Sequence, residues 1–130
     1  MRQVRVIRQA STGEVVLART RWCQSSWCRG RGLMFRRHLA EDEGLLFVYR
    51  RASVGGAAIQ MIFVFFPIAA VWLDEEVREI SATLARPWRP FYAPAAPAHY
   101  LIEARPALLD RVAVGDQLVF SEQAQTGKSI

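Results

Sequence analysis

The stretch between residues 52 and 73 carries no charged side chain, and it constrains the fold more than any other part of the sequence. A transmembrane helix needs about 20 consecutive apolar residues, so length alone allows a membrane span. Gly55, Gly56 and Pro67 oppose a continuous helix. Many of the apolar residues are also β-branched or aromatic, which favours strands. We therefore predict two buried strands, residues 59–65 and 68–73, and no membrane partner.

Short apolar segments separated by turn signals recur along the rest of the chain. Further strands are predicted at residues 4–6, 14–19, 45–49, 77–84, 100–104 and 117–120, and short helices at 22–28 and from Pro106 onward. Residues 50–58 and the proline-rich segment 86–97 are predicted to be loops. The pattern indicates a mainly β fold, a small single-domain β-sandwich or distorted barrel with one or two short helices. We expect one domain over residues 1–122 and a flexible C-terminal tail over 123–130.

The positive charge of the chain comes almost entirely from arginine. The formal net charge is +5, and Lys128 is the only lysine. Such a charge can attract phosphates or anionic lipid, or it can simply solvate the outer faces of strands. The arginines are scattered over the sequence without the aromatic and basic motifs of single-strand binders. We therefore favour solvated strand faces and keep a basic nucleic-acid-binding module as an alternative.

The sequence shows no recognisable catalytic or metal-binding motif. Cys23 and Cys28, with His38 and His99, are too few and too dispersed for a zinc site. If the two cysteines lie on a helix, their spacing points them to different faces, so we expect no disulfide between them. No nucleophile motif or phosphate loop is present. We expect no metal, no cofactor and no catalytic residue, and the absence of a signal-peptide pattern predicts a cytoplasmic protein.

Several short segments, in order and spacing, resemble the bacterial and archaeal family called domain of unknown function 192. These segments are Arg31-Gly32-Leu33-Met34 with Arg36, Gly44-Leu45-Leu46-Phe47, Phe66-Pro67-Ile68, Val71-Trp72-Leu73-Asp74, Arg86-Pro87-Trp88-Arg89, Leu101-Ile102-Glu103 and Gly115-Asp116. The resemblance covers residues 4–120 and implies a compact, mainly β fold resembling a small sandwich or distorted barrel. It implies no activity, because the family is uncharacterised.

The chain departs from the family pattern where the family carries polar side chains. The family's histidine, methionine, arginine and aspartate correspond to Gln60, Val64, Phe65 and Ala69. A site that depended on the histidine or the aspartate would therefore not operate here. Whether the replacement abolished the family's function or changed it stays open from the sequence.

The candidate ligand-binding residues are those that match the family or that lie in the aromatic loop. They are Arg36, Gln60, Trp88, Arg89 and Glu103. Glu103 stands out because it is a carboxylate within an apolar strand, although we favour an ion pair with an arginine such as Arg36 over a ligand-facing role. We predict a non-catalytic binding or accessory domain for a small polar or sugar-like ligand. The alternatives are a hydrolase-like enzyme with an unrecognised site, the nucleic-acid-binding module, and an interaction module with a large exposed apolar patch.

Overall fold

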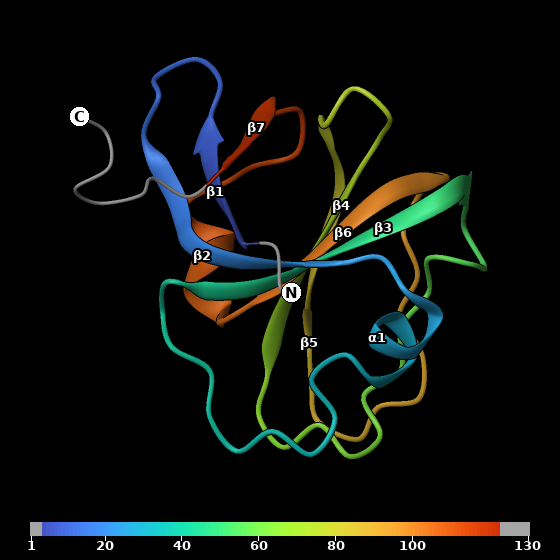
Figure 1. Ribbon diagram of the computed structural model, residues 1–130. Coiled ribbons are helices and arrows are strands. Elements are labelled where there is room, and N and C mark those ends of the chain that lie inside the picture. The colour runs from blue at the N-terminus through green and yellow to red at the C-terminus, as the bar shows by residue number, and fades with distance from the viewer. Residues whose placement is uncertain (1–3, 123–130) are drawn as a thin grey trace.

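A single curled sheet organises the computed structural model, which describes residues 4–122 (Figure 1). Its strands are β1 (Val4–Gln9), β2 (Val15–Cys23), β3 (Glu43–Ser53), β4 (Ile68–Leu73), β5 (Glu79–Ala85), β6 (Ala98–Ala104) and β7 (Leu118–Glu122). A short helix, α1 (Ser26–Arg31), follows β2, and a 3₁₀ helix, η1 (Pro106–Asp110), follows β6. The strands are arranged in the order β5-β4-β6-β3-β2-β1-β7. The sheet therefore has β3 at its centre, with β6 on one side and β2 on the other.

The sheet curls into a half-barrel because its two outer strands approach each other at one end. Arg78, just before β5, and Gln117, just before β7, form an antiparallel bridge. All neighbouring strands pair antiparallel except β2 and β3, which are parallel. A parallel pair needs a long connection, and here it comprises residues 24–42 and includes α1. The predicted mainly β class with a short helix is confirmed.

Strand β4 shows why this sequence builds a core on both faces of the sheet. All six of its residues are buried. Alternate side chains point to opposite faces, so Ile68, Ala70 and Trp72 join one hydrophobic cluster. Ala69, Val71 and Leu73 join the other, which includes Leu108 of η1. A strand buried on both faces reads as a continuous apolar run, which is how the sequence predicted it.

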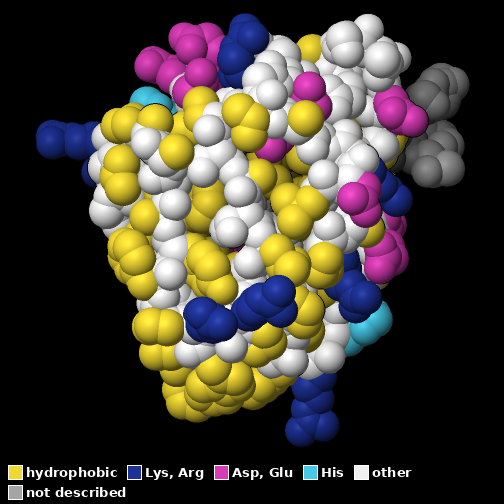
Figure 2. Space-filling model, turned by 180° about the vertical axis from the view of Figure 1, so that it is seen from behind, with side chains coloured by type: hydrophobic (Ala, Val, Ile, Leu, Met, Phe, Trp, Pro, Cys, Tyr) yellow, Lys and Arg dark blue, Asp and Glu magenta, His cyan; other side chains and the backbone are white. Residues whose placement is uncertain are grey.

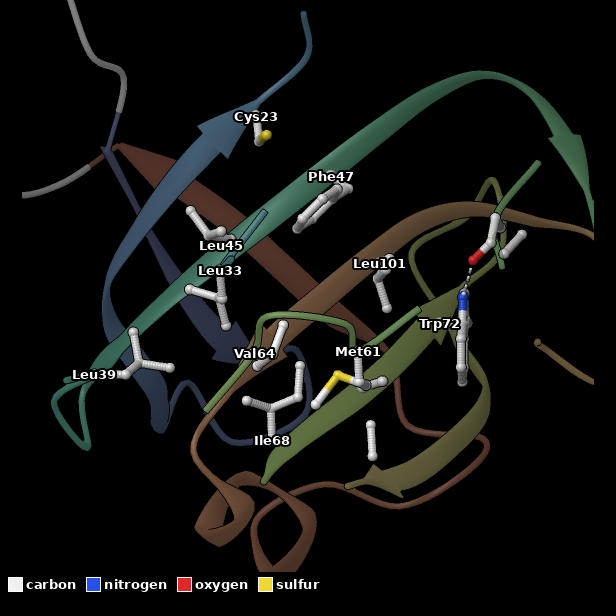
Figure 3. Close-up of a cluster of buried hydrophobic side chains, with 14 residues drawn as sticks. Cys23, Leu33, Leu39, Leu45, Phe47, Met61, Val64, Ile68, Trp72 and Leu101 are labelled. Atoms are coloured by element: carbon white, nitrogen blue, oxygen red, sulfur yellow. Dashed lines mark hydrogen bonds between the residues drawn. The ribbon is translucent and has the colours of Figure 1, made fainter. Parts of the chain in front are cut away.

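The loops that follow α1 and β3 cover the first of these clusters (Figure 3). Leu33 and Leu39 come from the loop after α1, and Met61 and Val64 come from the loop before β4. Trp72 is fully buried, and its indole Nε1 donates a hydrogen bond of 2.8 Å to the carbonyl oxygen of Ala57 (Figure 3). These loops are therefore part of the core, and their other residues are available to form sites at its edge.

The predicted strand at residues 59–65 is wrong. Only Ile59 forms a bridge, to Tyr92, and the rest of the segment is turn and loop. Phe63 has a positive φ of 64°, which no strand accommodates. Ile62, Phe63 and Phe65 are exposed, so this apolar run is not one buried strand. The predicted loop at 50–58 also begins later than expected, because β3 continues to Ser53.

The absence of a disulfide was also predicted wrongly, because Cys23 and Cys28 are bonded to each other. The prediction assumed that both cysteines share one helix. Instead Cys23 ends β2, and α1 begins only at Ser26. The turn between β2 and α1 changes the direction of the chain, so that the two Cα atoms lie 5.6 Å apart, a normal disulfide separation.

None of the helices within residues 4–122 has the length and hydrophobicity that crossing a bilayer requires. The predicted tail at residues 123–130 lies outside the described residues.

Candidate functional site

Glu103 on β6 is one of three buried polar side chains among the described residues, with Thr20 and Glu79. Glu103 is only 6% exposed and points to the same face of the sheet as Leu101. It lies opposite Leu45 of β3 and Ala70 of β4. Within residues 4–122 no side chain or backbone group hydrogen-bonds to its carboxyl group, whose oxygens keep some access to a hollow, whereas Oε1 of Glu79 is sealed without a partner. A buried carboxyl group without a partner is costly to a fold, so its presence needs a reason.

The carboxyl group of Glu103 borders a hollow of about 310 Å³ between β3, α1 and the loop before β4. This hollow, called here the Glu103 hollow, is lined by residues 29–34, Phe47, Tyr49, Gly56, Ala58–Met61, Val64 and Glu103. Its size is at the lower end of the range of small-ligand pockets. Its polar groups lie among apolar side chains, which is the usual composition of such pockets.

A glycine allows α1 to end close to the carboxyl group. Gly32 caps α1 with a positive φ of 51°, a conformation that residues with a Cβ rarely adopt. A Cβ at this position would lie 3.4 Å from Cζ of Phe47 and 3.6 Å from Oε1 of Glu103. A larger side chain at position 32 would therefore narrow the hollow at its polar end.

Burial controls the protonation of this site. It raises the pKa of Glu103 to about 8, because the charged form loses its hydration. Burial also raises the pKa of Tyr49, and the negative charge of Glu103 raises it further. At neutral pH the hollow therefore presents a protonated carboxyl group and a phenol, and each can both donate and accept a hydrogen bond.

Gln60 and Arg31 line the hollow with polar groups that are partly free. The Oε1 atom of Gln60 accepts a hydrogen bond from the backbone N–H of Ile62, whereas its Nε2 contacts only the sulfur of Met34, at 3.6 Å. Arg31 is exposed, and its guanidinium has no partner among the described residues. Arg29 is held in place by the carbonyl oxygens of Gln24 and Val48. The mouth of the Glu103 hollow therefore carries two cations, Arg29, whose guanidinium is held by hydrogen bonds, and Arg31, whose guanidinium has no partner among the described residues.

Arg36 lies beside an adjoining, larger hollow of about 860 Å³, which shares Arg31 and Gly32 with the first. Its Nη2 is 3.0 Å from a carboxylate oxygen of Glu43, and it also donates to the carbonyl oxygen of His38. The ion pair between Arg36 and Glu103 that the sequence left open is therefore not formed. Arg19, which also lines the larger hollow, is paired with Asp42, so much of the charge in this hollow is already neutralised.

The five residues predicted to bind a ligand are distributed over three places. Gln60 and Glu103 share the Glu103 hollow, and Arg36 lines the adjoining hollow. Trp88 and Arg89 line neither of these hollows and are exposed in the loop after β5. The structure thus brings together two of the five.

Sequence reasoning missed Tyr49 and Arg29. Tyr49 could have been found, because the alternation of β3 places it on the same face as Leu45 and Phe47. Arg29 could not have been found, because its position over the ring of Tyr49, 5.9 Å from the centroid, depends on how α1 docks. Across residues 4–122 no group of three or more His, Cys, Asp or Glu side chains is arranged to hold a metal ion.

Solved structures with the same fold are known. A Sinorhizobium meliloti protein, named as a candidate transcription regulator, superposes with a TM-score of 0.78 at 23% sequence identity, over 92% of each chain. A protein of unknown function from Novosphingobium aromaticivorans has the same TM-score at 21% identity, over 91% of this chain and 84% of its own. At these identities the likeness concerns the fold alone.

Sequence relatives are found among archaeal proteins of the uncharacterised UPF0127 group. A protein of Thermococcus kodakarensis is 30% identical over 104 residues, 78% of this chain but only 64% of its own length. A Pyrococcus furiosus protein is 29% identical over 108 residues, 82% of this chain and 90% of its own. The family model described as Uncharacterized ACR, also named DUF192, matches residues 7–120. The chain therefore belongs to the DUF192 family, as its motifs indicated.

Proposed function

We propose that this protein is a non-catalytic binding domain that takes a small polar, sugar-like ligand into the Glu103 hollow. The observation that carries the proposal is the carboxyl group of Glu103, which is buried without a partner and borders a hollow of about 310 Å³. A ligand hydroxyl that exchanged hydrogen bonds with this group would satisfy it.

The lining supports a neutral, hydroxyl-rich ligand. Glu103 and the hydroxyl of Tyr49 offer paired donors and acceptors, and the amide of Gln60 offers a further donor. Phe47 and Met61 supply apolar surface for the C–H face of a sugar ring. Arg31 at the mouth disfavours a cationic ligand by charge repulsion.

One observation favours an enzyme as the second candidate. A carboxyl group with a raised pKa is what a general acid requires, and the pKa of Glu103 is about 8. However, hydrolysis of a glycoside ordinarily uses two carboxyl groups. The described residues that line the Glu103 hollow include no second carboxylate, no histidine and no cysteine. We therefore place binding ahead of catalysis.

The proposal is tested by thermal-shift and calorimetric titration with a panel of monosaccharides and polyols. A sugar at a hundred times its dissociation constant adds about 2.7 kcal/mol to the free energy of unfolding, which raises Tm by several degrees. We expect the shift to fall in Tyr49→Phe and in Gln60→Ala, which remove polar groups from the hollow. Trp88→Ala is the matched control, because Trp88 does not line this hollow.

Two results would contradict the proposal. The first is the absence of a shift with every sugar and polyol of the panel. The second is a shift that Tyr49→Phe and Gln60→Ala leave unchanged, since the ligand would then bind elsewhere. Hydrolysis of nitrophenyl glycosides that is lost in Glu103→Gln would instead favour the enzyme.

A further inference from the structure

Large apolar side chains are exposed together at the end of the molecule where three loops meet. We call Phe35, Ile62, Phe63, Phe65 and Trp88 the aromatic tip; they are 54%, 40%, 40%, 48% and 52% exposed. They come from the loops after α1, before β4 and after β5, which lie at the lower end of the view in Figure 1. Figure 2 shows hydrophobic side chains gathered at this lower end, with Lys and Arg side chains beside them.

The side chains of the aromatic tip contact one another, and backbone hydrogen bonds join the loops that carry them. Phe35 stacks on Phe63 with 4.8 Å between ring centroids, and Phe63 meets Trp88 edge to face at 5.2 Å. The backbone N–H of Phe35 donates to the carbonyl oxygen of Phe63, and that of Trp88 donates to Met61, each at 2.8 Å. The three loops are therefore tied together beneath the rings.

The backbone beneath the rings is strained. Phe35, Phe63 and Trp88 have φ values of 66°, 64° and 68°, a region that bulky residues rarely occupy. Such strain persists only where the surrounding structure enforces it, and it is concentrated at functional sites. Here it accompanies aromatic side chains that are held at the surface, where the hydrophobic effect alone would not place them.

Unpaired positive charge surrounds the aromatic tip. Arg37, Arg86 and Arg89 are exposed in the same loops, and their guanidinium groups have no partner within residues 4–122. The two carboxylates of the loop after α1 are already paired, as Glu41–Arg105 and Asp42–Arg19, and Glu43 at the start of β3 is paired with Arg36. The loops before β4 and after β5, residues 54–67 and 86–97, contain no carboxylate. The end of the molecule therefore carries apolar side chains within a cationic rim.

We propose that the aromatic tip inserts into the interfacial region of an anionic phospholipid bilayer, with Arg37, Arg86 and Arg89 contacting the headgroups. Aromatic and aliphatic side chains on a basic surface bury readily at the boundary between headgroups and acyl chains. Arginine keeps its charge at the headgroup level while its aliphatic stem follows the apolar surface. This proposal departs from the prediction of no membrane partner, which rested on the argument against a membrane-spanning helix and did not consider insertion of loops.

Single-stranded nucleic acid is a less suitable occupant. Bases bind to such proteins by stacking on free aromatic faces. Phe35 and Phe63 lie nearly parallel, at 25°, so each covers one face of the other. Ile62 presents no ring at all. An aliphatic side chain among partly covered rings suits acyl chains better than bases.

Vesicle flotation tests the proposal with the full chain. The probes are vesicles of phosphatidylcholine alone and vesicles in which a minor part is phosphatidylserine. We expect binding to the anionic vesicles to weaken at least tenfold in Phe63→Ser/Trp88→Ser. The matched control is Trp27→Ser, because Trp27 is 77% exposed on α1, outside the aromatic tip. It should bind like the unmodified chain.

The charge of the rim is tested separately. Each basic side chain near an anionic surface changes affinity about fivefold, so Arg37→Gln/Arg86→Gln/Arg89→Gln should bind about a hundredfold more weakly. Arg50→Gln/Arg51→Gln removes two exposed arginines from β3 and should change binding far less. Unchanged melting temperatures verify that all these variants fold.

Three results would overturn the proposal. They are failure of the chain to float with anionic vesicles, equal flotation of Phe63→Ser/Trp88→Ser, and equal binding to neutral and anionic vesicles. Binding of a single-stranded oligonucleotide that the same variant abolishes, without any flotation, would assign the aromatic tip to nucleic acid instead.

Discussion

Replacing Glu103 by glutamine should stabilise the protein, and the gain should grow with pH. Folding raises the pKa of Glu103 from 4.5 to about 8 through burial. The protonated form is therefore favoured in the folded protein, and stability is highest below pH 4.5 and declines as pH rises through 8. At about 1.4 kcal/mol for each pH unit, complete ionisation removes about 5 kcal/mol of stability. Glutamine keeps the shape of the side chain and does not ionise.

The magnitude is large enough for an ordinary melting experiment. Most of the ionisation cost falls between pH 5 and pH 9, so the advantage of Glu103→Gln should increase by about 4 kcal/mol over that range. For a domain of this size that corresponds to on the order of 10 °C in the difference between the two melting temperatures. Calorimetry in buffers of matched ionic strength measures this difference directly. Glu75→Gln, at an exposed turn position, is the control.

A difference in melting temperature that stays constant from pH 5 to pH 9 would refute the reasoning. It would mean that the carboxyl group is hydrated or paired in solution. The same result would weaken the proposed binding site, which depends on an unsatisfied carboxyl group. It would leave the proposal for the aromatic tip untouched.

Two further predictions concern other buried polar groups. Burial, and then the charge of Asp116, raises the pKa of Glu79 to about 7, so Glu79→Gln should gain about 2–3 kcal/mol of stability at pH 8 relative to pH 5. Urea unfolding measures the stability difference between Glu79→Gln and the unmodified protein at each pH. The same difference at pH 5 and at pH 8 would contradict the prediction. Trp72→Phe should lose about 2–4 kcal/mol, because it leaves a small cavity and an unpaired carbonyl oxygen at Ala57. A loss below about 1 kcal/mol would show that the core closes around phenylalanine.

The sequence predicted the inner strands β4 and β6 well because most of their residues are buried and therefore apolar. The expected strands at 68–73 and 100–104 correspond to β4 and β6 to within two residues at each end. The run at 59–65 has a similar composition but forms a loop. Prediction from hydrophobic periodicity treats every apolar side chain as if it were buried in the core. It fails where Ile62, Phe63 and Phe65 are held at the surface.

The candidate site could be predicted only in part for a similar reason. Glu103 was recognisable as a carboxylate within an apolar strand, and β6 buries it as that position implies. Gln60 was selected from the family pattern and shares the same hollow. The grouping of Arg36 and Trp88 with them was an assumption about how loops fold over a sheet. Loop conformation depends on tertiary contacts such as the 2.8 Å hydrogen bond between Trp88 and Met61, which no local pattern encodes.

The parallel pairing of β2 with β3 has a consequence for how this family can diversify. The long connection that it requires, residues 24–42, supplies Arg31 and Gly32 to both hollows and Phe35 to the aromatic tip. Leu33 and Leu39 of this connection pack into the core and Cys28 is bonded to β2, but its exposed residues, such as Arg31 and Phe35, take no part in the strand ladders or in the core. These exposed residues can change without disturbing the sheet. A single crossover thus carries both the buried side chains that anchor it to the sheet and the exposed side chains that shape the two hollows and the aromatic tip. Relatives with one scaffold can therefore present quite different chemistry.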